Sequence, residues 1–544
     1  MIRKSIYLFL LIVAVYFGFA YLVAIGSLGS YEGPGEITTI PLPEEETIKR
    51  TERQLKDKNK IGIQDKKIIL FGDLHVHTTY SSDAFLTSLP LMAGEGTHPP
   101  ADACDFARYC SSLDFWSNTD HAEDLTPEDW QEIKESVRQC NNVSGNGQQD
   151  TIAFLGWEWT QEGGFGQPHY GHKNIILKDL DEDKIPARPI ASPQLGFANM
   201  PFSGRFALSS LKAFDGRVQD LMTYARDGVT IPCPSGVDVQ NLPSDCKEYA
   251  NNPGELFDKL NQWGHDAVVI PHGTAWGTYT PPEADWKNQL TEEFHDPNFQ
   301  TLIEVYSGHG NSELHRNWRS VLYDEEGQAI CPSPSENFLP ACWQAGVIIE
   351  ERCFEEGESD RECKKRAKET SLKSNPRFIV KALGSLEQKP GCPDYAINAL
   401  GKERLALLCK NECYNPSDIR REIDRIEIIK IIPQQYQDEK LDDLIMYPWK
   451  SFKCNGTEEC LVTFTDSDFE TQARDALYYA RAIEKESKAV NAGNLRCEVD
   501  AFGQCKEVNI CYGSPIQNPR EEDCLANTQE RAWSSPIFVD YKKY

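Results

Sequence analysis

Short apolar runs recur along the chain between polar stretches, at lengths that fit buried β-strands. The clearest runs are residues 67–74, 113–117, 152–157, 174–177, 267–270 and 301–306. Apolar side chains with helical spacing separate some of them, at 100–110 after the pair Pro99 and Pro100, and at 254–263. Strands that alternate with helices predict an α/β fold with a largely parallel sheet.

Two long polar stretches interrupt this alternation, at residues 178–253 and 311–449, and both are rich in proline, cysteine and charge. We interpret them as disulfide-stapled insertions within one domain that covers residues 68–544. The alternation is predicted to resume at 469–486, where alanine and leucine side chains have helical spacing.

The first thirty residues predict a membrane segment. An uncharged run from Ile6 to Ile25 follows Arg3 and Lys4, and twenty helical residues span about 30 Å, the thickness of a bilayer core. The pattern favours an uncleaved anchor with the bulk of the protein outside, on the periplasmic or outer face. A signal peptide cleaved near Gly26 is the alternative. Residues 31–67, rich in Gly, Pro, Glu and Lys, are predicted to form a linker.

Cysteine usage supports an oxidising compartment. The chain has 18 cysteines and no CxxC pair, so disulfides explain them better than metal ribbons do. Connectivity cannot be read from sequence, and pairing by proximity is only the simplest hypothesis. It would join 104 to 110, 233 to 246, 331 to 342, 353 to 363, 409 to 413, 454 to 460, 497 to 505 and 511 to 524.

Charge narrows the class of partner. Lys and Arg total 56 against 84 Asp and Glu, a net charge of −28. A surface this acidic repels polyanions, so nucleic-acid binding is not expected, whereas a local pocket for a small anionic substrate is compatible with the composition.

Candidate ligands for a metal follow the strand-like runs. His75 and His77 alternate by two and so point to one face of a strand, and Glu158 lies between two tryptophans, where a carboxylate must be paired, protonated or metal-bound. Singly, each has an ordinary explanation: Asp83 as a helix cap, His121 as a core histidine, or His272 as a turn residue. Together they would meet where the carboxyl ends of the strands open on one face.

The donor set consists of imidazoles and carboxylates without thiolates. That set suits Zn²⁺, Mn²⁺ or Fe²⁺, and the number of donors suits more than one ion. Clusters of divalent ions promote hydrolysis, because they lower the pKa of water and stabilise the attacking and leaving oxygens.

The ordered motifs FGDLHVHTTYSSDA, FWSNTDHAE, FLGWEWT, GHKNII, VIPHGT and IEVYSGHGNSE resemble those of the polymerase-and-histidinol-phosphatase (PHP) superfamily of metal-dependent phosphoesterases. More narrowly, they and the closing ERAWSSPIFV are similar to an exported, mostly bacterial PHP-like family known as a domain of unknown function. The resemblance covers nearly all of residues 68–540. It implies a distorted (β/α)7 TIM-like barrel with large disulfide-rich insertions and with up to three metal ions at the carboxyl ends of the strands.

Carried over by motif, the resemblance implies one set of metal ligands: His75, His77, Asp83, His121, Glu158, His172 and His272. His169 is the alternative to His172, and Asp120 is expected to orient a ligand from behind. The superfamily's late Asp-x-His motif is missing, so two or three ions are expected with the last one in doubt. Asp466 and Asp468 are possible substitutes.

Two functions follow from this pattern. The first is an exported metal-dependent hydrolase, a phosphoesterase, in which His121 or His272 transfers protons and His309 and Arg316 contact the anionic group of the substrate. The second is a non-catalytic extracytoplasmic binding or scaffold protein that retains part of a metal site. Metal content together with a screen of ester substrates separates the two.

Overall fold

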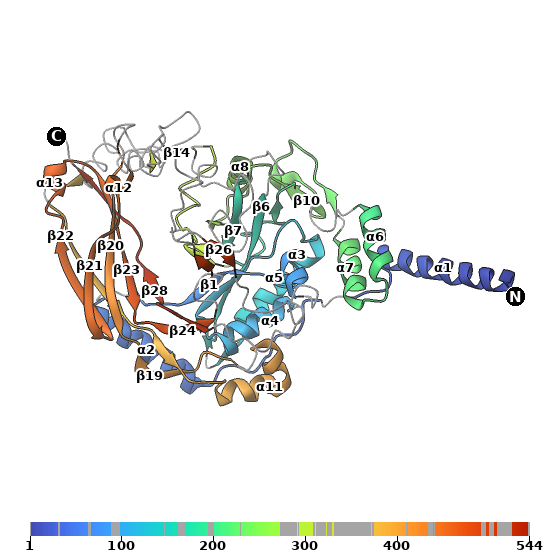
Figure 1. Cartoon of the computed structure of the whole chain (residues 1–544), viewed down its shortest axis with the longest axis horizontal. Coiled ribbons are helices and arrows are strands. Elements are labelled where there is room, and N and C mark those ends of the chain that lie inside the picture. The colour runs from blue at the N-terminus through green and yellow to red at the C-terminus, as the bar shows by residue number, and fades with distance from the viewer. Residues whose placement is uncertain are drawn as a thin grey trace.

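The computed structural model describes residues 2–30, 33–63, 67–88, 98–145, 147–161, 169–193, 201–228, 230–272, 291, 293–307, 310–311, 322–323, 329–330, 371–372, 375–409, 412–433, 439, 441–490, 497–499, 505–508 and 525–541. These residues form a mixed α/β body, a β-rich body beside it, and an N-terminal helix that projects away from both (Figure 1).

Two three-stranded sheets form the centre of the α/β body. The first has the parallel order β1 (Gly72–Val76), β2 (Phe115–Asn118), β5 (Ile152–Phe154). This arrangement agrees with the parallel pairing that the alternation of strands and helices predicts. Helix α4 (Pro100–Asp105) with the π-helical turn Phe106–Cys110 separates β1 from β2 in the chain, as predicted.

The second sheet has the order β11 (Ala267–His272), β7 (Gly171–Leu177), β6 (Gly156–Gln161), and both of its pairings are antiparallel. The expectation of a largely parallel sheet is therefore wrong for these strands. Only residues 162–170 separate β6 from β7, and a parallel crossover needs about a dozen residues or more.

The two sheets adjoin through a close backbone approach. His121, just after β2, forms a parallel bridge with Glu158 of β6, and the Asn174 side chain donates to the Leu74 carbonyl at 3.2 Å. Gly156 makes this approach possible, since a Cβ there would lie 2.9 Å from the carbonyl oxygen of Asn118 in β2. Among the described residues the strands form small sheets, and closure into a seven-stranded barrel stays a prediction.

Aromatic side chains fill the core between these sheets and their helices. Trp130, Trp157 and Trp159 are fully buried, and Trp130 belongs to α5 (Pro127–Asn142), which begins with a capping box between Thr126 and Asp129. Helix α8 (Pro253–Trp263) contributes Leu256, Phe257 and Leu260 to the same core, and it confirms the helix predicted at 254–263.

The β-rich body contains a six-stranded sheet, with the path β16 (Ser371–Leu372), β29 (Ile537–Tyr541), β23 (Ala476–Glu484), β20 (Ile423–Ile431), β21 (Ile445–Thr457), and with β28 (Arg531–Trp533) paired to β23. The pair β17 (Arg377–Leu383) and β22 (Glu459–Thr465) packs on it through Phe378 and Phe464.

Two predicted elements are wrong. The helix expected at 469–486 is a single turn, α13 (Phe469–Gln472), followed by strand β23. The tyrosines and the isoleucine of ALYYARAIE favour a strand. The alanines and the leucine fit there too, because side chains in a strand point alternately to the two faces of the sheet. The strand expected at 301–306 is reduced to β12 (Tyr306–Ser307).

The segment predicted as a linker contains helix α2 (Glu44–Ile61). This helix contacts both bodies: Arg50 donates to the Asp150 carbonyl at 2.9 Å, Asp57 pairs with Arg420 at 2.5 Å, and Lys60 pairs with Glu458 at 2.8 Å. Its sequence contains eleven charged side chains, and a helix that lacks an apolar stripe resembles a solvated stalk, so the sequence did not reveal its role.

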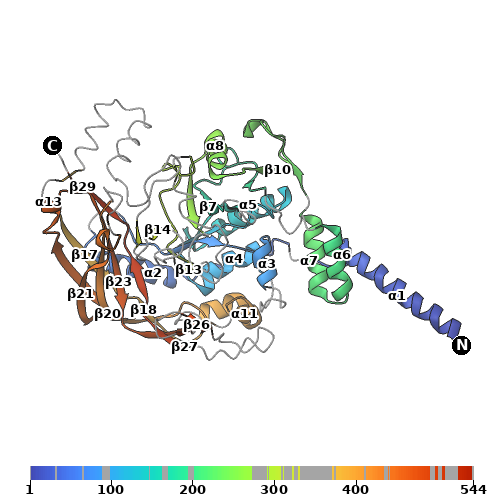
Figure 2. The ribbon, with the colours of Figure 1, turned by 45° about the horizontal axis from the view of Figure 1, so that its top comes forward.

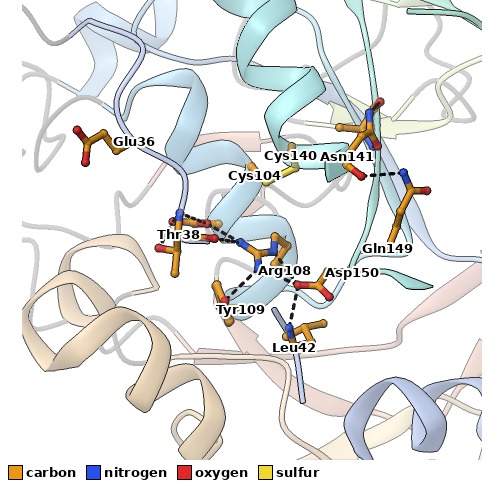
Figure 3. The surroundings of a disulfide bond; sticks show 12 residues. Glu36, Thr38, Leu42, Cys104, Arg108, Tyr109, Cys140, Asn141, Gln149 and Asp150 are labelled. Atoms are coloured by element: carbon orange, nitrogen blue, oxygen red, sulfur yellow. Dashed lines mark hydrogen bonds and ion pairs between the residues drawn. A yellow bond between two sulfur atoms is a disulfide. The ribbon is translucent and has the colours of Figure 1, made fainter. Parts of the chain in front are cut away.

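A buried arginine fastens the chain before α2 to the core (Figure 3). Arg108 is fully buried and pairs with Asp150 at 2.7 Å and with Asp105 at 3.1 Å. Its guanidinium also donates to the carbonyls of Thr38 and Ile40, each at 2.6 Å. The extended segment around Thr38 is therefore held by charge and hydrogen bonds more than by apolar contact.

Five disulfides are present among the described residues, and no described cysteine is free. The pairs 233–246 and 454–460 match the proximity hypothesis. The pairs 104–110 and 409–413 are wrong, because Cys104 bonds Cys140, Cys110 bonds Cys409, and Cys413 bonds Cys392. Helix packing brings these partners together, which sequence distance cannot show.

We expect titration of denatured, unreduced protein with a thiol reagent to find few free thiols, since the described cysteines are bonded. Each bridge typically contributes about 2–4 kcal/mol to stability, so prior reduction should lower the melting temperature strongly. A dozen or more free thiols would contradict both the disulfides and the oxidising compartment.

The N-terminal helix α1 (Ile2–Ala24) includes a stretch, Ser5–Ala24, that is long and apolar enough to cross a membrane. Two helices pack on its carboxyl-terminal part, α6 (Phe202–Lys212) and α7 (Gly216–Asp227). Both views show the rest of α1 projecting beyond them (Figures 1 and 2).

Candidate metal centre

The structure brings together all seven side chains that the sequence singled out as metal ligands. Their donor atoms, with those of Glu304, form four overlapping groups in which every atom lies within 4.8 Å of the others. The groups are His75, His77 and Glu158; Glu158, His172 and His272; His77, Asp83 and His121; and His75, His272 and Glu304.

Glu158 occupies the centre of the cluster and is only 1% exposed. Its Oε2 lies 3.1 Å from His75 Nε2 and 3.0 Å from His77 Nε2. Its Oε1 lies 2.6 Å from His172 Nδ1 and 3.3 Å from His272 Nε2. The two oxygens of this one carboxylate therefore face two different pairs of imidazoles.

Two more carboxylates flank this centre. Asp83 Oδ2 lies 3.2 Å from His121 Nε2, and the Asp83 side chain is 53% exposed. Glu304 Oε2 lies 2.6 Å from His75 Nδ1 on another side. The cluster thus has a deeply buried carboxylate in the middle and a solvent-accessible one at Asp83.

Strand direction explains how residues so far apart in sequence meet. His75 lies near the carboxyl end of β1, His121 follows β2, and His272 ends β11. His172 lies instead near the amino end of β7, opposite His272 in the antiparallel register. Because β7 runs the other way, its amino end reaches the edge where the other strands finish.

Hydroxyl groups orient the imidazoles. Thr160 Oγ1 donates to Glu158 Oε1 at 2.8 Å and lies 2.7 Å from His121 Nδ1. A hydroxyl has one proton, so satisfying both contacts requires a proton on His121 Nδ1, which leaves its Nε2 to face Asp83. Ser81 lies 2.8 Å from His77 Nδ1 and accepts from the His121 backbone N–H at 3.0 Å.

The electrostatics of the cluster favour cations. Burial opposes the charged form of His75, yet its hydrogen bonds to Glu158 and Glu304 raise its pKa to about 10. Burial likewise opposes ionisation of Glu158, but the charge of His121 and the hydrogen bond from His172 hold its pKa well below the usual value. Without metal, the protons on the surrounding histidines therefore balance the negative charge of these carboxylates. A divalent ion that binds the site would displace those protons.

His272 differs from His75. Burial, the largest influence, together with the nearby charge of His75, lowers the pKa of His272 to about 4 despite the attraction of Glu158. His272 is therefore neutral at pH 7, which is the form of histidine that binds a metal.

Asp120 and His169 lie beside the cluster and outside the four groups. Asp120 accepts from the Thr78 backbone N–H at 2.5 Å and from the Thr78 hydroxyl at 2.8 Å, so it fixes the chain after His77 instead of hydrogen bonding an imidazole. His169 stacks on His172 with ring centroids 6.0 Å apart. Between these two candidates, His172 is the histidine in the cluster.

Sequence reasoning missed Glu304, Ser81 and Thr160. Glu304 lies inside the quoted motif IEVYSGHG, where the later histidine drew the attention, and an acidic residue within an apolar run was the available signal. His309 and Arg316, the predicted substrate contacts, lie outside the described residues.

The proposed substitutes for the missing Asp-x-His are wrong. Asp466 is buried in the β-rich body, where it accepts from the Tyr478 hydroxyl at 2.5 Å and pairs with Lys430. Asp468 precedes α13 in the same body. Neither belongs to a group of potential metal ligands within the described part of the chain.

The donor set fits divalent ions. Ligands about 2.0–2.2 Å from zinc at tetrahedral angles lie roughly 3.4 Å apart, close to the separations between Glu158 and the nitrogens around it. If each imidazole binds one ion, no more than two of the four groups can be filled together, because the groups share His75, His77 and His272.

No protein-family model, curated protein or solved structure matches this chain. The class is therefore defined by the structure alone. The chain is a disulfide-bonded, mixed α/β protein with one apolar N-terminal helix and a histidine–carboxylate cluster that could hold metal ions.

Proposed function

We propose that this protein is a membrane-anchored, extracytoplasmic metal-dependent hydrolase that acts on phosphoesters. The observation that carries the proposal is Glu158, whose two oxygens face separate pairs of histidines. A carboxylate in this position suits the bridge of a two-ion centre, and such centres are typical of phosphate ester hydrolysis.

The protein's own residues have distinct roles in this proposal. His75 and His77 would hold one ion with Glu158 Oε2, and His172 and His272 would hold the other with Oε1. Zn²⁺, Mn²⁺ or Fe²⁺ bound there would supply Lewis acidity and a nucleophilic water at neutral pH. Thr160 and Ser81 fix the imidazole orientations.

Asp83 is the exposed carboxylate of the cluster and lies beside the mostly buried His121, so we assign the substrate side of the site to Asp83. Because Thr160 engages His121 Nδ1, the nitrogen that can exchange a proton is Nε2, which faces Asp83. His121 and Asp83 would therefore share that proton, and the exposed Asp83 would pass it to or from the substrate. His272 is fully enclosed, so we assign it to metal binding and not to proton transfer. His309 and Arg316 stay the predicted contacts for the anionic group of the substrate.

The test begins with elemental analysis of the full-length chain purified without added metal. We expect about two equivalents of a transition metal per chain and turnover in a panel of phosphomonoesters, phosphodiesters and carboxylic esters, with preference for a phosphoester. Protein with no transition metal and no turnover, before and after Zn²⁺, Mn²⁺ or Fe²⁺ is added, would instead favour the binding or scaffold role.

A matched pair of variants sharpens this test. His172→Asn removes a donor 2.6 Å from Glu158, whereas His169→Asn removes a neighbouring buried imidazole that lies outside the four groups. We expect the first to lose metal and activity and the second to keep both. Equal losses in the two variants would indicate a packing effect and contradict the assignment of His172.

A further inference from the structure

The membrane anchor has a structural difficulty that leads to a new inference. Residues Ser5 to Val15 of α1 extend beyond α6 and α7, whereas from Tyr16 onward these two helices pack against one face of α1. The opposite face stays open there, with Phe17 46% and Tyr21 49% exposed. Eleven helical residues span only about 17 Å, well short of a bilayer core of about 30 Å. The part of α1 that extends beyond α6 and α7 is therefore too short to cross a membrane without the part on which these helices pack.

The contacts of α6 extend well down α1. Phe202 packs against Tyr21, and Phe214, just beyond α6, stacks on Phe19 with ring centroids 5.0 Å apart. The Tyr16 hydroxyl donates to the Ser210 carbonyl at 2.8 Å. Tyr16 lies eight residues before the end of α1, or about 12 Å along the helix axis.

The outer surface of α6 suits lipid. Leu211 is 81% exposed, Phe214 74% and Phe202 45%. The charged residues of α6 are Arg205 and Lys212, both basic. Long basic side chains reach from apolar surroundings to anionic headgroups, and the next charges along the chain, Asp215 and Arg217, neutralise each other at 2.7 Å.

We infer that the hairpin of α6 and α7 enters the outer leaflet beside α1. The inference rests on the membrane anchoring in the proposed function. With α6 and its loop in the hydrocarbon, Tyr16–Ala24 is also within the bilayer, and the apolar length of α1 is sufficient to span it. The occupant of the exposed apolar face of α6 is thus the lipid of the same membrane.

This arrangement places the metal cluster near the membrane surface. Tyr224 of α7 stacks on Phe85 with ring centroids 4.8 Å apart, and its hydroxyl donates to the Tyr80 carbonyl at 3.1 Å. Phe85 belongs to α3 (Ser82–Ser88), the helix that carries Asp83. One helix therefore separates the inserted hairpin from the open side of the cluster, and phosphoesters presented at the membrane surface are within its reach.

Photo-crosslinking in the full-length protein tests the insertion. The probe is p-benzoylphenylalanine at Phe214 or, in a second variant, at Leu211, with the protein reconstituted in vesicles of phosphatidylethanolamine and phosphatidylglycerol. A probe at Phe9, 65% exposed on the free part of α1, is the positive control, and one at Ile231, 75% exposed on β9 (Ile231–Pro232), is the negative control.

After irradiation, we expect mass spectrometry to find lipid adducts at positions 9, 211 and 214 and none at 231. Adducts at 9 without adducts at 211 and 214 would overturn the insertion and leave the anchor intact. Adducts at none of the positions would overturn the anchor and the insertion together. Using two hairpin positions guards against a variant that fails to fold.

Discussion

Replacement of Glu158 by glutamine is expected to abolish hydrolysis and to reduce bound metal from about two ions to one or none. The amide keeps the shape of the side chain, but it loses the negative charge and offers only one oxygen. It therefore cannot face both histidine pairs as an acceptor. Removing a residue that only hydrogen bonds a metal ligand already costs about 10–100-fold in metal affinity. We therefore expect a larger loss of affinity here. Elemental analysis measures the bound metal, and kcat/KM measures the activity.

Glu248→Gln is the matched control. Glu248 is also fully buried, but it pairs with Arg188 and Lys259, away from the cluster. This variant should lower stability and keep its metal content. If Glu158→Gln retains two ions and full turnover, then Glu158 does not bridge the site and the two-ion proposal fails.

Replacement of Arg108 by methionine is expected to lower the free energy of unfolding by about 3–5 kcal/mol. The change leaves Asp150 and Asp105 buried without their guanidinium partner, and it also removes the donors to the Thr38 and Ile40 carbonyls. Denaturant unfolding measures the loss. Limited proteolysis should reveal earlier cleavage around Thr38, because the segment loses the contacts that hold it to the core.

Lys178→Met serves as the surface control for this change. Lys178 pairs with Asp266 at 2.8 Å, but its side chain is 70% exposed, and surface substitutions usually change stability by no more than about 0.5 kcal/mol. Equal effects of the two substitutions would show that the Arg108 network adds nothing beyond an ordinary surface ion pair.

The residues that make up the candidate site were predictable from the sequence. Which of them contact one another was not. Residues that follow apolar runs were expected to converge, and the side chains from His75 to His272 do lie together. Glu304 escaped notice because its run, expected as a strand, is largely irregular. That Glu158 lies between two histidine pairs depends on the register of β6 and β7, which no local pattern encodes.

The α/β body followed its local patterns more closely than the β-rich body did. Helices α4 and α8 have proline at their starts and apolar spacing that only a helix satisfies. By contrast, the residues of β23 satisfy helical and strand spacing equally, and pairing with β20 decides between them. The sequence likewise left open whether β7 runs parallel or antiparallel to β6. The predicted alternation of strands and helices does not anticipate two strands joined by a short antiparallel connection.

By itself, the sequence determined the apolar helix at the N-terminus, the use of its cysteines for disulfides, and the set of imidazoles and carboxylates available to a metal. These are properties of composition and of spacing over a few residues. Tertiary structure alone decided that Cys110 bonds Cys409, that α6 packs on the carboxyl-terminal part of α1, and that Glu158 lies between two histidine pairs. Each of these depends on packing between segments far apart in the chain, where the free energy of burial outweighs local preference.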